Sequence, residues 1–448
     1  MMKNNVKYII LFFVFLFSMI FVYIPFRMDT YVNYGFSYGI ANGQIPYKDF
    51  NLIVPLFGPF IYSILLFFNK SILVFYIEQS ILLVLFSKLL FKMMDRKAWI
   101  IIVALFCPFI FSFAYCLFPG YNFLILFEML LLVYLHDNNK SDKLIGFIAG
   151  ISLLTKQNIG IFILLVTIFY PFLKNKKQSL VRFIYSMIPV LIFFVYLLLS
   201  NSFLNFINLC FLNLYEFTGN FQVKTLYLIL FIISLFIVFI SFFNKKDKNI
   251  SYYYLFGYIP IVYPLIESHH VSLFLFFAFI VMIYNMNFKV TKLIPFISFI
   301  IIIIIIFIFL LDFIGRINYF KFKFYSFHNF PAELLPYSVK EEYDEIIKYV
   351  PGKKVIYVGD PSQTIFFSST TSSPLNMYYI LFKGNQGYNG RKNLIANIKN
   401  EKNTYFIISK FVVCYDKGCQ FDMSIPELIE NNYKLVKELD NFSIYYKE

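Results

Sequence analysis

Long apolar runs recur along most of this chain and constrain its fold more than any other feature. Hydrophobic segments lie at about 7–26, 71–91, 98–118, 122–136, 144–157, 159–173, 179–200, 225–243, 250–266, 271–287 and 293–313. A helix of about twenty apolar residues crosses the hydrocarbon core of a bilayer. Only 14% of the residues are charged, against about 25% in soluble domains. The pattern predicts an α-helical polytopic membrane protein with about eleven transmembrane helices.

Two of the runs need separate interpretation. The first, 7–26, ends in "YIPFRMD" without a small-residue cleavage site, so we interpret it as a retained anchor and not as a signal peptide. The run 54–68 contains Pro55, Gly58 and Pro59 and is short for a span of about twenty residues. We therefore expect it to be interfacial or re-entrant.

The distribution of basic residues predicts the topology. With a cytoplasmic N-terminus and 54–68 not crossing, most basic residues of the membrane region fall in cytoplasmic loops, as the positive-inside rule requires. In the alternative topology the N-terminus lies outside and 54–68 crosses the membrane. The number of basic residues on the cytoplasmic side is then nearly the same, and only the first loop moves to the cytoplasm. The charges alone leave both topologies open.

The composition changes near residue 318, which divides a membrane domain (1–317) from a C-terminal domain (318–448). There "PYSVKEEYDEIIKYV" predicts an amphipathic helix, "KKVIYVGD" a strand, "NLIANIKNEKNTYFIIS" a helix then a strand, and "IPELIENNYKLVKELDNFSIYYK" a helix then two strands. Alternating helices and strands predict a small α/β domain. Both topologies place it outside the cytoplasm.

The distribution of charge and the spacing of the cysteines argue against nucleic-acid binding and against a structural zinc site. The net charge is +14, but the lysines are dispersed in short clusters between apolar runs, so we expect no nucleic-acid partner. The Cys/His spacing of a structural zinc site is lacking. Cys414 and Cys419 are close enough in sequence to bridge a turn, and the sequence leaves open whether they do.

The first predicted outer loop, 27–53, is long and polar for a connection between spans. It holds Arg27 and Asp29 just past the first run, then Tyr47, Lys48 and Asp49. The acids are either solvated loop residues or part of a site at the membrane surface, where tyrosines are favoured.

Two later stretches also bring polar residues to the predicted outer face. Lys156 lies between two short apolar arms, at or below the interface, and either snorkels outward or holds a lipid phosphate. Glu267 and His270 occupy a short turn that is either solvated or able to bind metal, proton or phosphate. Together these features suit a lipid-linked phosphate substrate: cations would stabilise a departing phosphate, and a carboxylate would activate an acceptor hydroxyl.

Three of these motifs resemble the GT-C superfamily of multi-span glycosyltransferases, which use polyprenyl-phosphate sugars. "DTY…GIANGQIPYKDF…PL" is similar to that family's first outer loop, "GISLLTKQNIG" to its lysine hairpin, and "YPLIESHH" to its acid-plus-histidine turn. The resemblance implies that Asp29 is the catalytic acid, that Lys156 is the family's lysine, and that the first loop lies outside. The sequence departs from the family pattern at one point. Some branches of the superfamily have two adjacent acidic residues here, whereas Asp29 is followed by threonine.

The resemblance implies transfer of a sugar, with inversion, from a polyprenyl-phosphate carrier to an envelope glycan, lipid or protein acceptor at the outer face of the cell membrane. We expect Asp29 to act as the base, and Arg27, Tyr47, Lys48, Asp49, Lys156, Glu267 and His270 to bind substrate. No cofactor is implied with certainty, although a divalent cation would fit. A transporter or flippase of lipid-linked glycans is the main alternative, and a non-enzymatic scaffold ranks last.

Overall fold

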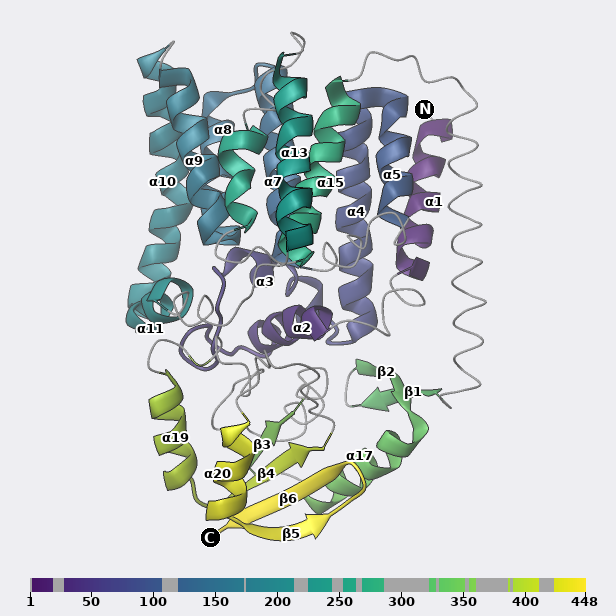
Figure 1. Ribbon diagram of the computed structural model, residues 1–448, viewed down its shortest axis with the longest axis vertical. Coiled ribbons are helices and arrows are strands. Elements are labelled where there is room, and N and C mark those ends of the chain that lie inside the picture. Colours follow the sequence, from purple (N-terminus) through teal and green to yellow (C-terminus); the bar gives the residue numbers. More distant parts are fainter. Residues whose placement is uncertain are drawn as a thin grey trace.

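A computed structural model shows a mostly helical protein with a small C-terminal sheet (Figure 1). It describes residues 2–18, 28–106, 120–172, 175–212, 225–243, 253–262, 268–285, 322–327, 330–350, 354–359, 386, 390–410 and 423–448. The longer helices run side by side as a bundle. They are α1 (Met2–Ser18), α4 (Ile72–Met94), α5 (Ala98–Phe106), α7 (Tyr121–Asp137), α8 (Asp142–Thr155), α9 (Gln157–Phe172), α10 (Lys176–Leu199), α13 (Thr225–Phe243) and α15 (Ser268–Asn285).

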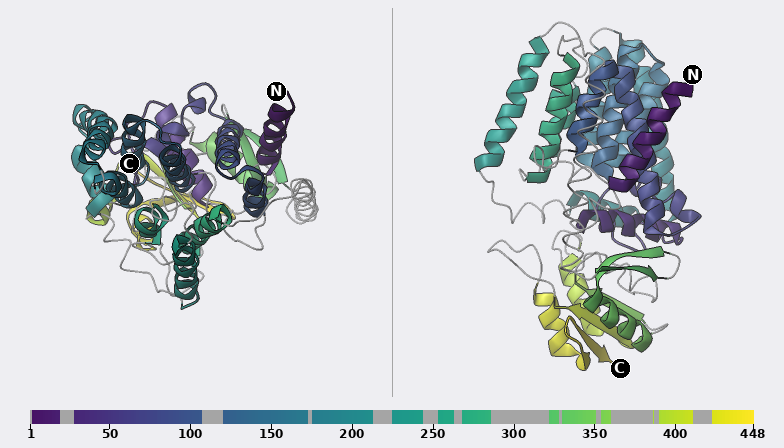
Figure 2. Two further views of the ribbon diagram at one scale, coloured as in Figure 1. Left: turned by 90° about the horizontal axis from the view of Figure 1, so that it is seen from above. Right: turned by 90° about the vertical axis from the view of Figure 1, so that its right-hand side faces the viewer.

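Shorter helical pieces complete the bundle. They are α2 (Met28–Ala41), α3 (Phe57–Ile61), η3 (Leu65–Phe67), η4 (Asp95–Lys97), α11 (Phe203–Ile207), the π-helices η5 (Asn208–Leu212) and η6 (Tyr253–Tyr258), and η7 (Ile259–Val262). The bundle has two ends, which we call the sheet-facing end, beside the C-terminal sheet, and the far end (Figures 1 and 2).

Length and apolar composition allow two described helical stretches to cross a membrane: Leu73–Leu105, which comprises most of α4 with the η4 turn and α5, and Lys176–Leu199, which is α10. Shorter apolar helices accompany them in the described chain, and the predicted run 293–313 lies outside the described residues. Large apolar side chains of α10 and α13 are exposed, among them Ile192 (65%), Leu199 (82%) and Phe236 (63%). Apolar surface of this kind marks contact with lipid or with another protein.

The stretch that was expected to be a long loop contains a buried helix. α2 lies across the sheet-facing end, roughly perpendicular to α4 (Figures 1 and 2). Residues 32–40 of α2 are all buried, so this part of the helix is covered on every side. Within residues 54–68 the helices are only the short α3 and η3, so no long helix runs through this stretch.

Glycines let α8 pack directly against the backbones of its two neighbours. A Cβ atom at Gly146 would lie 2.3 Å from the carbonyl oxygen of Arg182, and one at Gly150 would lie 2.2 Å from that of Ser186, both in α10. A Cβ atom at Gly160 in α9 would lie 2.3 Å from the carbonyl oxygen of Ser152 in α8. This small-xxx-small spacing brings helix backbones together, as in membrane helix pairs. The three helices consequently form one tight unit.

The C-terminal elements agree with the sequence prediction. α17 (Tyr337–Tyr349), β3 (Lys354–Val358), α19 (Gly390–Asn400), β4 (Thr404–Ser409), α20 (Ser424–Asn432), β5 (Lys434–Glu438) and β6 (Phe442–Lys447) follow in the expected order. The four strands form one sheet, β3-β4-β6-β5, in which β3 and β4 are parallel and the other pairs antiparallel. A hairpin of β1 (Phe322–Phe327) and β2 (Phe330–Pro336) was not expected, and β2 contacts α4.

Candidate functional site at the sheet-facing end

A buried lysine occupies the turn between α8 and α9. Lys156 is the only residue between the two helices, has an extended backbone, and is 7% exposed. Its Nζ donates to Oδ1 of Asn122 at 2.7 Å and lies 5.3 Å from the centre of the Tyr121 ring. Both partners come from the first turn of α7. A buried ammonium group of this kind marks a candidate anion site.

The two residues after the lysine attach the turn to two other elements. Gln157 Nε2 donates to the carbonyl oxygen of Cys210 in η5 at 2.8 Å, and Asn158 Nδ2 donates to that of Pro260 in η7 at 3.1 Å. Each polar residue of the "KQN" sequence thus bonds to a different element. The turn is fixed from three directions, which limits the positions open to the lysine.

Helix α2 reaches the same region through Asn33. A Cβ atom at Gly120 would lie 2.9 Å from Asn33 Nδ2, and Gly120 directly precedes Tyr121. Asp29 belongs to the first turn of α2, four residues before Asn33. The side chain of Asp29 and all of Arg27 lie outside the described residues.

Tyr47 and Asp49 build the turn that follows α2. Tyr47 is 2% exposed and has a positive φ of 66°; its hydroxyl donates to the carbonyl oxygen of Val54 at 2.9 Å. Burial raises the pKa of Tyr47 well above its usual value, which keeps the phenol protonated. An oxygen of the Asp49 carboxylate accepts from the N–H of Ile45 at 2.7 Å. These contacts are structural, while Lys48 is exposed to solvent.

The same turn is connected to the lysine by α11 and η5. Asn205 Nδ2 donates to the carbonyl oxygen of Tyr47 at 2.8 Å, and the Cys210 thiol lies 3.7 Å from the carbonyl oxygen of Leu52. Because Gln157 bonds to Cys210, the first loop and the lysine turn share one chain of contacts.

The predicted acid-plus-histidine turn is described only in part. Glu267 lies outside the described residues, and His270, half-buried, belongs to the first turn of α15. The opposite end of α15 lies at the far end of the bundle, where Tyr284 donates to Asp137 at 2.8 Å. His270 is therefore at the sheet-facing end.

Two buried acids of this region were not among the predicted site residues. Glu78 in α4 and Glu128 in α7 are each 7% exposed, and Oε2 of each lacks a hydrogen-bond partner within the described part of the chain. The signal was present in the sequence: a single acid inside an apolar run, as in "YIEQS" and "LFEML". Acids within apolar helices are costly and usually functional. The described residues contain no group of three or more His, Cys, Asp or Glu suited to a metal ion.

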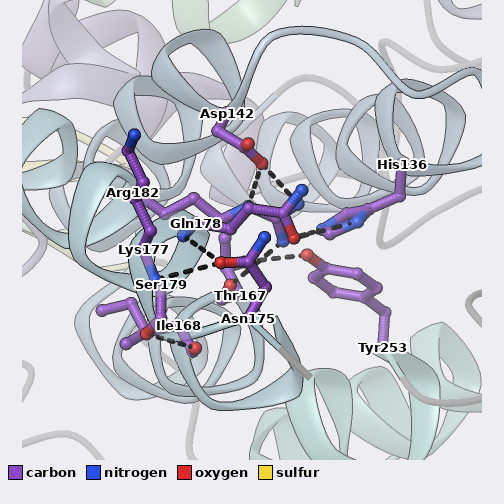
Figure 3. A network of polar contacts seen from close by, with 10 residues as sticks. All are labelled: His136, Asp142, Thr167, Ile168, Asn175, Lys177, Gln178, Ser179, Arg182 and Tyr253. Atoms are coloured by element: carbon purple, nitrogen blue, oxygen red, sulfur yellow. Dashed lines mark hydrogen bonds and ion pairs between the residues drawn. The ribbon is translucent and has the colours of Figure 1, made fainter. Parts of the chain in front are cut away.

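A second polar network closes the far end (Figure 3). Arg182 of α10 is 6% exposed, and its guanidinium pairs with Asp142 of α8 at 2.7 Å and lies 3.1 Å from Nε2 of His136 of α7. Nη1 also donates to the carbonyl oxygen of Thr167 in α9 at 3.3 Å. The network joins four helices and has the form of a structural clamp.

Cys414 and Cys419 lie outside the described residues, and Cys210 is a buried free thiol.

Comparison with known proteins finds no match: no protein-family model, curated protein or solved structure is significantly similar to this chain.

Proposed function

We propose that this chain is a multi-pass membrane glycosyltransferase that moves a sugar from a polyprenyl-phosphate carrier to a cell-envelope acceptor. In this reaction an acceptor hydroxyl attacks the anomeric carbon, the bond from that carbon to the phosphate oxygen breaks, and the polyprenyl phosphate leaves. The acceptor proton passes to a carboxylate, for which we propose Asp29. The reaction needs a cation at the phosphate and a base close to it.

The observation that carries the proposal is the burial of Lys156 at the end of an apolar bundle. Its ammonium group is held by Asn122 and by the face of Tyr121, in a turn fixed to three other elements. A cation at this depth favours an anion that arrives from the membrane surface, and a lipid phosphate has its charge at that level.

The position of α2 supports the role of Asp29. Asn33 adjoins Gly120, beside the residues that hold Lys156, and Asp29 lies one turn earlier on the same helix. At a rise of about 1.5 Å per residue, the four residues from Asp29 to Asn33 correspond to about 6 Å along the helix axis. The base and the cation would then flank one bound sugar phosphate.

Basic residues at the opposite end support the proposed topology. Lys92 lies over the Tyr134 ring at 5.8 Å and Lys143 over the Tyr185 ring at 5.4 Å, both at the far end. Following the positive-inside rule, we assign the far end to the cytoplasm and the sheet-facing end, with the C-terminal sheet, to the outside.

The test is consumption of radiolabelled polyprenyl-phosphate sugars by membranes that contain the full chain. Asp29→Asn should lower donor consumption about a hundredfold or more, because the base is lost, and Lys156→Met should weaken phosphate binding. Lys434→Ser removes an exposed lysine of the C-terminal sheet, outside the predicted site, and serves as the control. Full activity of Asp29→Asn at normal protein levels would refute the mechanism.

A second candidate, a transporter or flippase of lipid-linked glycans, is favoured by one observation. Buried Glu78 and Glu128 within apolar helices are the kind of groups that line ion or substrate pathways. Proteoliposomes separate the two functions, because movement of a fluorescent polyprenyl-phosphate lipid across the bilayer without donor consumption would support transport.

A further inference from the structure

Helix α7 holds the lysine turn at a second point, through an acid that the proposed mechanism does not use. Glu128 lies six residues after Asn122 in α7, and its Oε1 accepts from the Thr155 hydroxyl at 2.6 Å. Thr155 ends α8 and directly precedes Lys156. Asn122 therefore binds the end of the lysine side chain, while Glu128 binds the residue beside its backbone.

The bond to Glu128 is not needed to satisfy Thr155. The Thr155 hydroxyl also lies 3.2 Å from the carbonyl oxygen of Ile151, a bond that threonines in helices commonly make on their own. Without Glu128, Thr155 would still have an acceptor within its own helix.

Stability does not account for the acid either. Glu128 is buried. The hydroxyl groups of Thr155 and Ser152 lie beside its carboxyl group, and its Oε2 has no hydrogen bond within the usual distance to the residues that the structure describes. Burying a carboxyl group without full hydrogen bonding costs free energy, so an apolar residue at this position would be less costly. A function that depends on the position of the turn explains its presence better.

We propose that Glu128 is a positioning residue for Lys156, which fixes the turn so that the ammonium group meets the phosphate of the lipid substrate. Lysine has a long flexible stem, and much of its freedom is lost when it is held. Anchoring Thr155 and Nζ to one helix sets both ends of that stem. The identity of the ligand rests on the proposed function, whereas the positioning itself does not.

The test measures the position of Lys156 without any assay of function. Full-length protein in lipid nanodiscs is acetylated briefly, and the rate at Lys156 is measured by peptide mass spectrometry with exposed Lys48 as the internal reference. Glu128→Leu and Thr155→Val should each raise the rate at Lys156 about fivefold to tenfold, the range expected for loss of one buried hydrogen bond. The double variant should show an acetylation rate at Lys156 no higher than that of either single variant. Glu128→Gln, which keeps a side-chain oxygen for Thr155, should retain the wild-type rate.

Thr167→Val is the matched control, because it also removes one buried threonine hydrogen bond, the one to Tyr253 at 2.8 Å, but lies near the far end of α9. A Lys156 rate in Glu128→Leu equal to wild type, or an equal rise in Thr167→Val, would overturn the proposal. In a parallel experiment, a long-chain polyprenyl phosphate should bind Glu128→Leu about tenfold more weakly than wild type, a difference of about 1.4 kcal/mol. Absence of binding to wild type would count against the proposed function alone, and equal binding by both proteins against the positioning role alone.

Discussion

A methyl group at Gly150 should separate two helices that now touch backbone to backbone. In Gly150→Ala the added Cβ would lie 2.2 Å from the carbonyl oxygen of Ser186 and 2.7 Å from Cγ of Pro189, where 3.4 Å is ordinary contact. Overpacking of this kind costs about 1–3 kcal/mol, and alanine regains about 1 kcal/mol of helix propensity over glycine. The clashing atoms are a backbone oxygen and a proline ring carbon, which cannot rotate away, so we expect the upper end of that range, about 3 kcal/mol. Less the gain in helix propensity, the net loss is about 2 kcal/mol, a factor of about thirty in the unfolding equilibrium.

The control is Gly257→Ala in η6, where the new Cβ would lie 3.4 Å from Cγ1 of Ile163. The chemical change is the same, but there is room for the methyl group, so this variant should be as stable as wild type or slightly more stable. Both variants can be compared by SDS titration of the full chain in mixed micelles, followed by far-ultraviolet circular dichroism. Equal midpoints for the two variants would refute the direct packing of α8 on α10.

Three other predictions concern contacts at the two ends of the bundle and one buried tyrosine of the C-terminal elements. Arg182→Leu should lower the free energy of unfolding by about 3 kcal/mol, because Asp142 loses its partner at a largely buried site; an unchanged denaturation midpoint would argue against the clamp. Asn205→Ala should speed amide exchange in the turn around Tyr47, whose carbonyl oxygen it now binds, and identical exchange there would contradict the link. Burial raises the pKa of Tyr433 to about 12, so the unfolded chain ionises first and this contribution to stability should disappear between about pH 10 and 12; Tyr433→Phe, followed by thermal denaturation, should lack that loss.

The sequence predicted the elements of the tail well because each has a local signal. Amphipathic spacing in "SVKEEYDEIIKY" and the β-branched run in "KKVIYV" identify α17 and β3 without any tertiary information. The hairpin of β1 and β2 was missed although "FKFKF" (320–324) alternates between apolar and basic residues as a strand does. The connecting "HN" is not a standard hairpin turn, and "FPAELLP" contains prolines and does not alternate. Strand order is also non-local and was not predicted.

The first loop shows where local reasoning failed. The segment 27–53 was interpreted as a long polar loop at the membrane surface, yet its residues "YVNYGFSYGIA" belong to α2, which is buried over 32–40. Tertiary burial outweighs the low helix propensity of glycine here. Asp49 was considered for substrate binding, and its bond to Ile45 could not have been foreseen without the turn geometry.

The lysine was found from the sequence, whereas its partners were not. Lys156 stands out because a charge interrupts apolar residues, but Asn122, Glu128 and Cys210 come from segments far apart in the sequence. Glu128 carried the same signal as Lys156 and was missed because a single acid in a run barely changes its hydropathy.

The central claim, that the α2 loop and the C-terminal sheet share the outer side, can be tested directly by sided labelling. Single cysteines replace exposed Lys48, Lys434 or Lys140 in a chain without native cysteines, and intact cells receive a membrane-impermeant maleimide. We predict that positions 48 and 434 react before the cells are broken and that position 140 reacts only afterwards. Labelling of 434 without 48, or of 140 in intact cells, would contradict the shared outer side and, with it, the proposed site of sugar transfer.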